Sequence, residues 1–220
     1  VAEEEEVEEE PILEKQEKQY SLLLVEDNED LLQLMVRLLS VEYTVYTAKD
    51  GKEGIAVVEQ NDVDLIVSDV MMPVMAGIEF CKNVKSNFDT SHIPVIQETA
   101  KNNEEDRVEA YESGADGFIS KPFSLSVLHA RIENLLSTRE RMTKNFKKQL
   151  VFEAQELNYT SLDEEFLQQA IDCVHRHLDD PDFGQTQFVE ELHTTKSTSF
   201  RKLKSLTGLS FSSFVRNIRM

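Results

Sequence analysis

Side chains that can bind a metal ion or a phosphate group follow short apolar runs at several points of the sequence. Asp69 ends the apolar run 63–68, and Pro73 breaks the chain soon afterwards, a pattern typical of a buried strand that delivers a carboxylate to a loop. Carboxylates, an ammonium and a hydroxyl at one place could hold a hard cation such as Mg²⁺ together with phosphate oxygens. Other short apolar runs end near the groups needed for such a site, which are Glu26, Asp27, Thr99 and Lys121.

The segments that must position these groups alternate along the chain between strand-like and helix-like patterns. Short apolar runs predict strands, and segments with helical spacing predict a helix after each strand. This alternation indicates an α/β fold with a doubly wound five-stranded parallel sheet of order 2-1-3-4-5. Ligands bind such sheets outside the carboxyl ends of the strands, so the polar groups should converge there. The predicted strands are 21–25, 43–47, 63–68, 93–96 and 117–119, and the predicted helices are 31–39, 51–60, 77–87, 103–113 and 125–136.

Charge is distributed unevenly along the 220 residues, whose formal net charge is -19. Residues 1–19 carry nine Glu against two Lys, which predicts a solvated acidic linker. Residues 185–220 carry six Lys and Arg against two Glu. An acidic protein is poorly suited to nucleic acid, because binding neutralises phosphates with Lys and Arg, so the basic end is the exception to explain.

The sequence also indicates a cellular setting. Cys81 and Cys173 lie far apart in helical patterns, so we expect both to be reduced and buried, as in a cytoplasmic protein. No apolar run approaches the ~20 residues of a membrane span, so we expect no membrane contact from this chain. The first residue is Val1 rather than Met, which indicates a fragment whose full-length protein could be anchored through a preceding part.

Five short motifs occur in order over residues 20–137, and with them this part of the chain resembles the receiver domain of two-component response regulators. They are Val25-Glu26-Asp27-Asn28, Ser68-Asp69-Val70-Met71-Met72-Pro73, Thr99-Ala100-Lys101, Gly114-Ala115-Asp116 and Lys121-Pro122-Phe123. The resemblance implies that Asp69 accepts a phosphoryl group from a histidine kinase, which could belong to the same full-length chain. It also implies that Mg²⁺ is held by Asp27, Asp69 and the carbonyl of Met71, with Glu26 acting through water.

The same resemblance implies roles for three further residues. Thr99 and Lys121 would contact the phosphoryl oxygens, and the ring of Phe118 would follow the Thr99 hydroxyl inward as the domain switches. The bond between Lys121 and Pro122 is expected to be cis. Phosphoryl transfer needs an aligned nucleophile and neutralised phosphoryl oxygens, which agrees with these assignments.

Some residues depart from the family pattern. Receivers usually have apolar residues at the positions of Gln97 and Glu98, and a Glu beside Thr99 would oppose phosphorylation unless a cation such as Lys101 pairs with it. Ala76 stands where the family commonly has Asp. Phe118 replaces the more frequent Tyr and loses a phenol hydrogen bond.

Each candidate has a plainer interpretation. Asn and acidic residues near a helix start often act as caps or dipole partners, as Asn28 and Asp30 could do here. The same alternative applies to Asp27 and Asp69. Lys121 could be an ordinary surface lysine. Thr99 could be a plain strand residue.

Beyond the receiver-like part, residues 138–160 are charged and predict a helical linker, which is either solvated or part of a homodimer contact. Residues 161–220 predict a small all-α segment. Within it, two short helices joined by a tight turn at 193–195 indicate a helix-turn-helix.

The stretch 200–210 resembles the AraC-type DNA-binding domain, of which the chain would contain the first of two helix-turn-helix units. This likeness implies that Thr195 caps a recognition helix. It also implies a set of polar and basic candidates for contact with bases or phosphates, although a basic helix face can simply be solvated. The candidates are Lys196, Ser197, Thr198, Arg201, Lys202 and Lys204.

The order of parts is an acidic linker (1–19), a receiver (20–137), a helical linker (138–160) and a partial AraC-type segment (161–220). It resembles the C-terminal region of hybrid two-component proteins and predicts a phosphorylation-controlled transcription regulator rather than an enzyme. One alternative is a receiver that acts through protein contacts without phosphorylation. A second is a phosphohydrolase of the haloacid dehalogenase type, but that family needs an Asp where Met71 stands.

Overall fold

The computed structural model describes residues 20–100, 112–148 and 160–219. Most of the predicted helix 103–113, the acidic linker 1–19 and part of the linker 138–160 lie outside these residues. No helix among the described residues is long and apolar enough to cross a bilayer.

Five parallel strands form one sheet in the predicted order β2-β1-β3-β4-β5. The prediction of a doubly wound α/β fold is therefore confirmed. Residues of β1 alternate between the two faces of the sheet, and both faces are apolar, as expected for a buried parallel sheet. The strands are β1 (Ser21–Val25), β2 (Thr44–Ala48), β3 (Leu65–Asp69), β4 (Val95–Ala100) and β5 (Gly117–Lys121).

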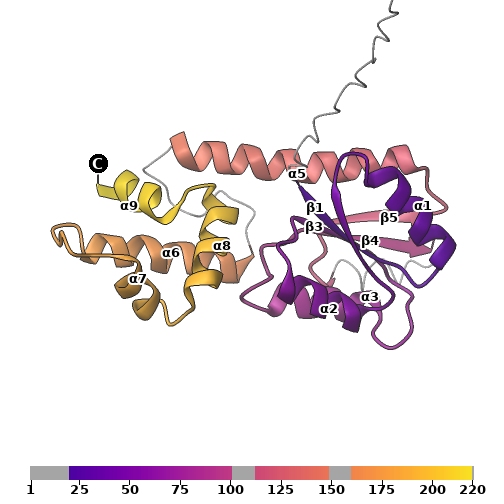
Figure 1. Ribbon diagram of the computed structural model, residues 1–220, viewed down its shortest axis with the longest axis horizontal. Coiled ribbons are helices and arrows are strands. Elements are labelled where there is room, and N and C mark those ends of the chain that lie inside the picture. The colour runs from indigo at the N-terminus through magenta and orange to yellow at the C-terminus, as the bar shows by residue number, and fades with distance from the viewer. Residues whose placement is uncertain (1–19, 101–111, 149–159, 220) are drawn as a thin grey trace, which may run out of the picture.

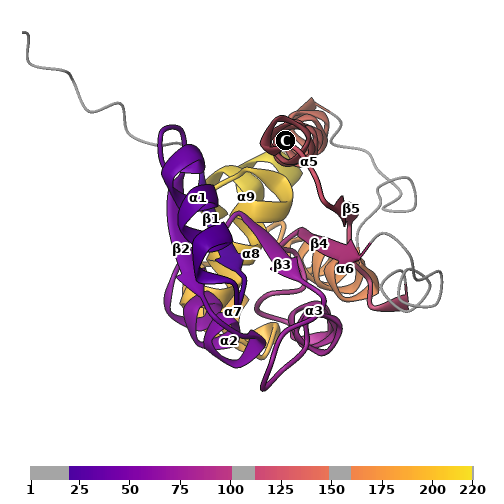
Figure 2. The same ribbon diagram turned by 90° about the vertical axis from the view of Figure 1, so that its right-hand side faces the viewer.

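Helices cover both faces of this sheet. On one face α1 (Glu29–Leu39) and α5 (Leu125–Lys148) pack against Leu22, Leu24 and their neighbours. On the other face α2 (Gly51–Gln60) and α3 (Gly77–Ser86) pack around Phe80. Figures 1 and 2 show α2 and α3 on the opposite side of the sheet from α5.

The helix α5 continues well past the predicted end at residue 136 and extends beyond the sheet (Figure 1). The structure shows no break between the predicted last receiver helix and the start of the predicted linker. The physical reason is the absence of Gly and Pro from the whole helix, which is rich in Leu, Arg, Glu and Lys.

The C-terminal residues form four helices around a second apolar core, and we call them the helical segment. The turn between α7 and α8 lies where it was predicted, and the side chain of Thr195 caps α8 by accepting a hydrogen bond from the Thr198 amide at 3.2 Å. Phe88, from the α/β part, packs against the same core. The four helices are α6 (Ser161–Arg176), α7 (Gln185–Glu191), α8 (Lys196–Thr207) and α9 (Phe211–Arg219).

Candidate functional site

Three carboxylates meet at the carboxyl edge of the sheet. Glu26 and Asp27 directly follow β1, and Asp69 is the last residue of the neighbouring strand β3. One carboxylate oxygen from each lies within 4.8 Å of the other two. Glu26 and Asp69 are buried, whereas Asp27 is exposed. The winding of the sheet thus collects acids from separate parts of the sequence at one point.

Lys121, at the end of β5, connects two of these acids. Its Nζ lies 2.7 Å from Glu26 Oε2 and 2.7 Å from Asp69 Oδ2. Burial lowers the pKa of Lys121, but the hydrogen bonds to Asp69 and Glu26 outweigh that effect and raise the pKa above its usual value. The bond between Lys121 and Pro122 is cis, as the resemblance implied. The side chain is therefore a firmly held ammonium inside the acid cluster.

Glu98 brings a fourth carboxyl group to the same lysine. Glu98 Oε2 lies 3.3 Å from Lys121 Nζ, and neither carboxyl oxygen has a hydrogen-bond partner among the described residues. Burial raises the pKa of Glu98 to about 7; Lys121 opposes this rise, and the negative charges of Glu26 and Asp69 reinforce it. The sequence interpretation named Lys101 as the partner, but Lys101 lies outside the described residues.

The other unusual residue, Gln97, has a structural role. It is fully buried, and its Nε2 donates to the carbonyl of Gly77 at 2.9 Å. The amide therefore ties β4 to the first residue of α3.

The loop after Asp69 folds back so that its residues contact both the side chain and the backbone of Asp69. The amide of Met71 donates to Asp69 Oδ1 at 3.2 Å, which orients the carboxylate. A Cβ atom at Gly77 would lie 1.9 Å from the carbonyl oxygen of Asp69, so only glycine fits there. The local sequence thus sets the direction of the Asp69 side chain.

The predicted switch residues lie on adjacent strands. Thr99 is within β4 and buried, and its hydroxyl has no hydrogen-bond partner in the described part of the chain. Phe118 is half-buried on β5, where it pairs with Gln97.

The acid cluster fits a hard divalent cation. Its donors are all oxygens, the carboxylates of Glu26 and Asp69 are buried, and that of Asp27 is exposed to solvent. A cavity of about 470 Å³ lined by Glu26 and Asp27 adjoins them. A larger cavity of about 780 Å³ lies elsewhere, between the α/β part and the helical segment, and contains none of these acids.

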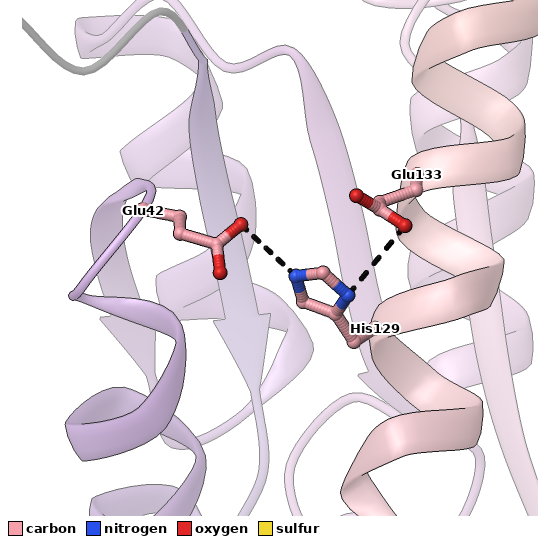
Figure 3. Close-up of side chains that lie close together, drawn as sticks. All are labelled: Glu42, His129 and Glu133. Carbon is pink, nitrogen blue, oxygen red and sulfur yellow. Dashed lines mark hydrogen bonds and ion pairs between the residues drawn. The ribbon is translucent and has the colours of Figure 1, made fainter.

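A second acidic group with a histidine lies on the outside of the sheet (Figure 3). His129 Nε2 is 3.1 Å from Glu42 Oε2, and His129 Nδ1 is 3.7 Å from Glu133 Oε2. Each ring nitrogen faces a different carboxylate, and both carboxylates are largely exposed. This arrangement is best explained as polar surface contacts that tie α5 to the turn before β2.

The predicted DNA-contacting residues of α8 have very different surroundings. Lys196, Ser197 and Lys204 are exposed, and Thr198 is half-buried at the helix start. Arg201 Nη1 lies 3.4 Å from Asp62 Oδ1 of the α/β part.

Lys202, another residue of the predicted DNA-contacting set, is buried in this structure, because its side chain is 0% exposed. It faces the α/β part, where its Nζ binds Ser91 and the carbonyl of Phe88. Sequence analysis missed this cluster, which also includes Asp163, because no local pattern links residues so far apart.

A flavodoxin-like α/β domain with acids and a lysine at the carboxyl edge of its sheet is the architecture of two-component signalling domains. The chain belongs to the response regulator receiver domain family, whose model matches residues 22–133.

Two curated relatives match different shares of the chain. "Histidine kinase P4" of Formosa agariphila is 34% identical over 200 residues, covering 91% of this chain and 15% of that protein. The "Uncharacterized transcriptional regulatory protein YrkP" of Bacillus subtilis is 38% identical over 114 residues, covering 51% of this chain and 48% of that protein. The chain therefore spans less than half the length of these relatives.

A solved structure supports the fold. The receiver domain of a signal transduction histidine kinase from Syntrophus aciditrophicus matches with a TM-score of 0.52 and 34% identity, covering 54% of this chain and 91% of that one. Like the family model, this match covers about half of the chain. The longer match to the Formosa agariphila kinase also includes part of the helical segment, since it covers 91% of the chain.

Proposed function

We propose that this chain is a phosphorylation-controlled regulator in which Asp69 accepts a phosphoryl group from a histidine kinase. The observation that carries the proposal is the position of Lys121, whose ammonium bridges Asp69 and Glu26 at 2.7 Å each. An ammonium beside a nucleophilic carboxylate can neutralise the charge of an incoming phosphoryl group.

The transfer would form a bond between a carboxylate oxygen of Asp69 and phosphorus, while the bond from phosphorus to the kinase histidine breaks. The Met71 amide holds one oxygen of Asp69, and Lys121 holds the other. Thr99 has a hydroxyl with no hydrogen-bond partner among the described residues, so it can donate to a phosphoryl oxygen without losing a bond.

Asp27, Asp69 and the carbonyl of Met71 would hold Mg²⁺, with Glu26 acting through water. The cation would supply positive charge to the transferring oxygens. The all-oxygen set and the exposed position of Asp27 agree with a cation that keeps some of its own waters.

We further propose that the helical segment is an AraC-type helix-turn-helix that binds DNA. The support is a short helix, a tight turn and a second helix with exposed Lys196 and Lys204. The kinase could belong to the same full-length protein, since the match that covers most of this chain is to a protein named as a histidine kinase.

The phosphoacceptor is tested with purified protein, Mg²⁺ and a small phosphodonor such as acetyl phosphate. Intact-mass spectrometry should show the addition of one phosphoryl group, which is lost in Asp69→Asn and on removal of Mg²⁺ by a chelator. Asp50→Asn is the matched control and should leave the modification unchanged, because Asp50 caps α2 through two backbone amides and is not one of the three grouped carboxylates.

The second candidate is a receiver that works through protein contacts alone. It is favoured by Glu98, a buried carboxyl group that competes for Lys121 and would repel a phosphoryl group. If the parent protein gains no phosphoryl group from either acetyl phosphate or a purified histidine kinase, this candidate is favoured over the first.

A further inference from the structure

Lys202 is a buried ammonium at the boundary between the receiver and the helical segment. Its Nζ lies 2.7 Å from the carbonyl oxygen of Phe88, 2.9 Å from Ser91 Oγ and 2.8 Å from Asp163 Oδ1. Ser91 Oγ also donates to Asp163 Oδ1 at 2.8 Å. A buried charge is costly unless it is paired and hydrogen-bonded, and an ammonium has three hydrogens to donate. The receiver supplies two of the three acceptors.

Aromatic packing encloses the same ammonium. The Nζ of Lys202 lies 4.1 Å from the centroid of the Phe88 ring, and that ring packs edge-on against Phe166 of α6 at 5.5 Å. Phe88 is thus a receiver side chain that packs against the core of the helical segment.

The neighbouring cation of α8 also faces the receiver. Arg201 Nη1 lies 3.4 Å from Asp62 Oδ1, in the turn that follows α2. The side chains of two consecutive basic residues of α8, Arg201 and Lys202, therefore bind groups of the receiver. Lys196 and Lys204 of the same helix are exposed.

The receiver side of this contact is a loop of residues 87–94 between α3 and β4, which we call the docking loop. Lys85 Nζ binds the carbonyl of Ile93 at 2.8 Å, and Thr90 Oγ1 binds the carbonyl of Val84 at 2.8 Å. These bonds hold the docking loop in one shape. Its two flanking elements both reach the acid cluster, since α3 starts against Asp69 and β4 carries Glu98 and Thr99 just before its last residue.

We propose that the docking loop and Asp62 form a docking surface for α8, and that the receiver competes with DNA for Arg201 and Lys202. The competition rests on the proposed DNA-binding function of the helical segment, whereas the docking does not. Lys and Arg that neutralise DNA phosphates must be free to reach them, so the docked α8 offers DNA only part of its charge.

Docking is measured without DNA by timed acetylation of the whole chain with acetic anhydride and peptide mass spectrometry. Lys202 should react at least about tenfold more slowly than Lys204 of the same helix, because it must first lose charge-assisted hydrogen bonds. The double variant Phe88→Ala, Asp62→Ala should bring the Lys202 rate close to that of Lys204. Equal rates in the parent protein would overturn the docking.

Competition is measured by fluorescence anisotropy with a generic DNA duplex at low salt. The double variant should bind about tenfold more tightly than the parent, through two recovered cations. Phe88→Ala, Glu59→Ala is the matched control for net charge, because Glu59 is exposed near the end of α2, whereas the acids that pair with Arg201 and Lys202 among the described residues are Asp62 and Asp163.

The outcomes separate the two ideas. Faster Lys202 labelling with unchanged, measurable DNA affinity would overturn the competition. Faster labelling with no DNA binding by any variant would overturn the proposed DNA-binding function and support the docking alone. If the double variant and its Glu59 control bind DNA with equal affinity, the tighter binding is due to the loss of Phe88 alone. The proposed competition for Arg201 would then be wrong.

Discussion

At the level of single residues, Glu98 distinguishes this site from a simple acid cluster with one lysine. Its carboxyl group shares Lys121 with Asp69 and Glu26, so one ammonium faces three carboxyl groups. A buried carboxyl without hydrogen bonds destabilises the fold whenever it is charged, and it repels a phosphoryl group on Asp69.

Replacement of Glu98 by Gln should therefore stabilise the receiver and favour phosphorylation. We expect the free energy of unfolding at pH 8 to rise by about 1–3 kcal/mol, because a neutral amide of the same shape removes a buried charge that has only a share of Lys121 as its partner. Urea denaturation measures the first effect, and intact-mass spectrometry with acetyl phosphate measures the second. The control is Glu79→Gln, an exposed residue of α3. A lower phosphorylated fraction in Glu98→Gln would show that Glu98 assists the transfer.

Residue types alone were enough to identify Glu26, Asp27, Asp69 and Lys121 as one group, because each follows a recognisable strand. The sequence also drew attention to Glu98, but its pairing with Lys121 depends on how far β4 extends. The predicted strand ended at Ile96, whereas β4 continues to Ala100 and carries Glu98 into the interior.

At the level of the elements, α3 begins with a weak N-terminus. Ala76 occupies the cap position with an extended backbone, φ -66° and ψ 154°, and makes no side-chain cap bond. In contrast, Asp50 caps α2 by accepting from two backbone amides. Because α3 starts at Gly77, directly against Asp69, its first turn matters to the site.

The substitution Ala76→Ser should stabilise the protein by about 1 kcal/mol, because a serine hydroxyl in this conformation can accept a hydrogen bond from the first turn of the helix. The reverse change at the matched position, Asp50→Ala, should cost a similar amount, about 0.5–2 kcal/mol. Urea denaturation followed by circular dichroism measures both. An unchanged midpoint in Ala76→Ser would mean that its hydroxyl does not reach the helix amides.

Most elements could be predicted because the short apolar runs of the strands are clearly separated from the segments with helical spacing. The errors occurred where no Gly or Pro marks an end, as in α5, which runs on through the predicted boundary at residue 137. Thr195 was predicted as a cap from its type and position, and it is one.

At the level of the whole molecule, contacts between distant parts of the chain could not be predicted from the sequence. Lys202 and Phe88 are 114 residues apart, and a basic residue in a helix next to other basic residues looks solvated or DNA-binding. Only the packing of α8 against the receiver shows that this lysine faces inward. The same packing places a half-buried histidine among cations, which makes the assembly sensitive to acid.

His92, in the docking loop, has a buried Nδ1 with no hydrogen-bond partner among the described residues. Burial lowers the pKa of His92 well below its usual value, and nearby cations from three elements lower it further. These are Arg139 of α5, Lys202 and Arg201 of α8, and Lys85 of α3. Below about pH 6.5 the unfolded chain takes up a proton at this residue and the folded chain does not. The free energy of unfolding therefore falls as the pH falls through this window.

Between pH 7.5 and 5.5 the parent protein should lose about 1 kcal/mol more stability than His92→Asn, as measured by urea denaturation at both pH values. The exposed His175 provides the control, since His175→Asn should keep the parent's dependence. Two of the four cations belong to α8, so Phe88→Ala, Asp62→Ala should also weaken the dependence by releasing that helix. Equal losses in the parent and in His92→Asn would mean that His92 is hydrated, and that α8 does not cover the docking loop in solution.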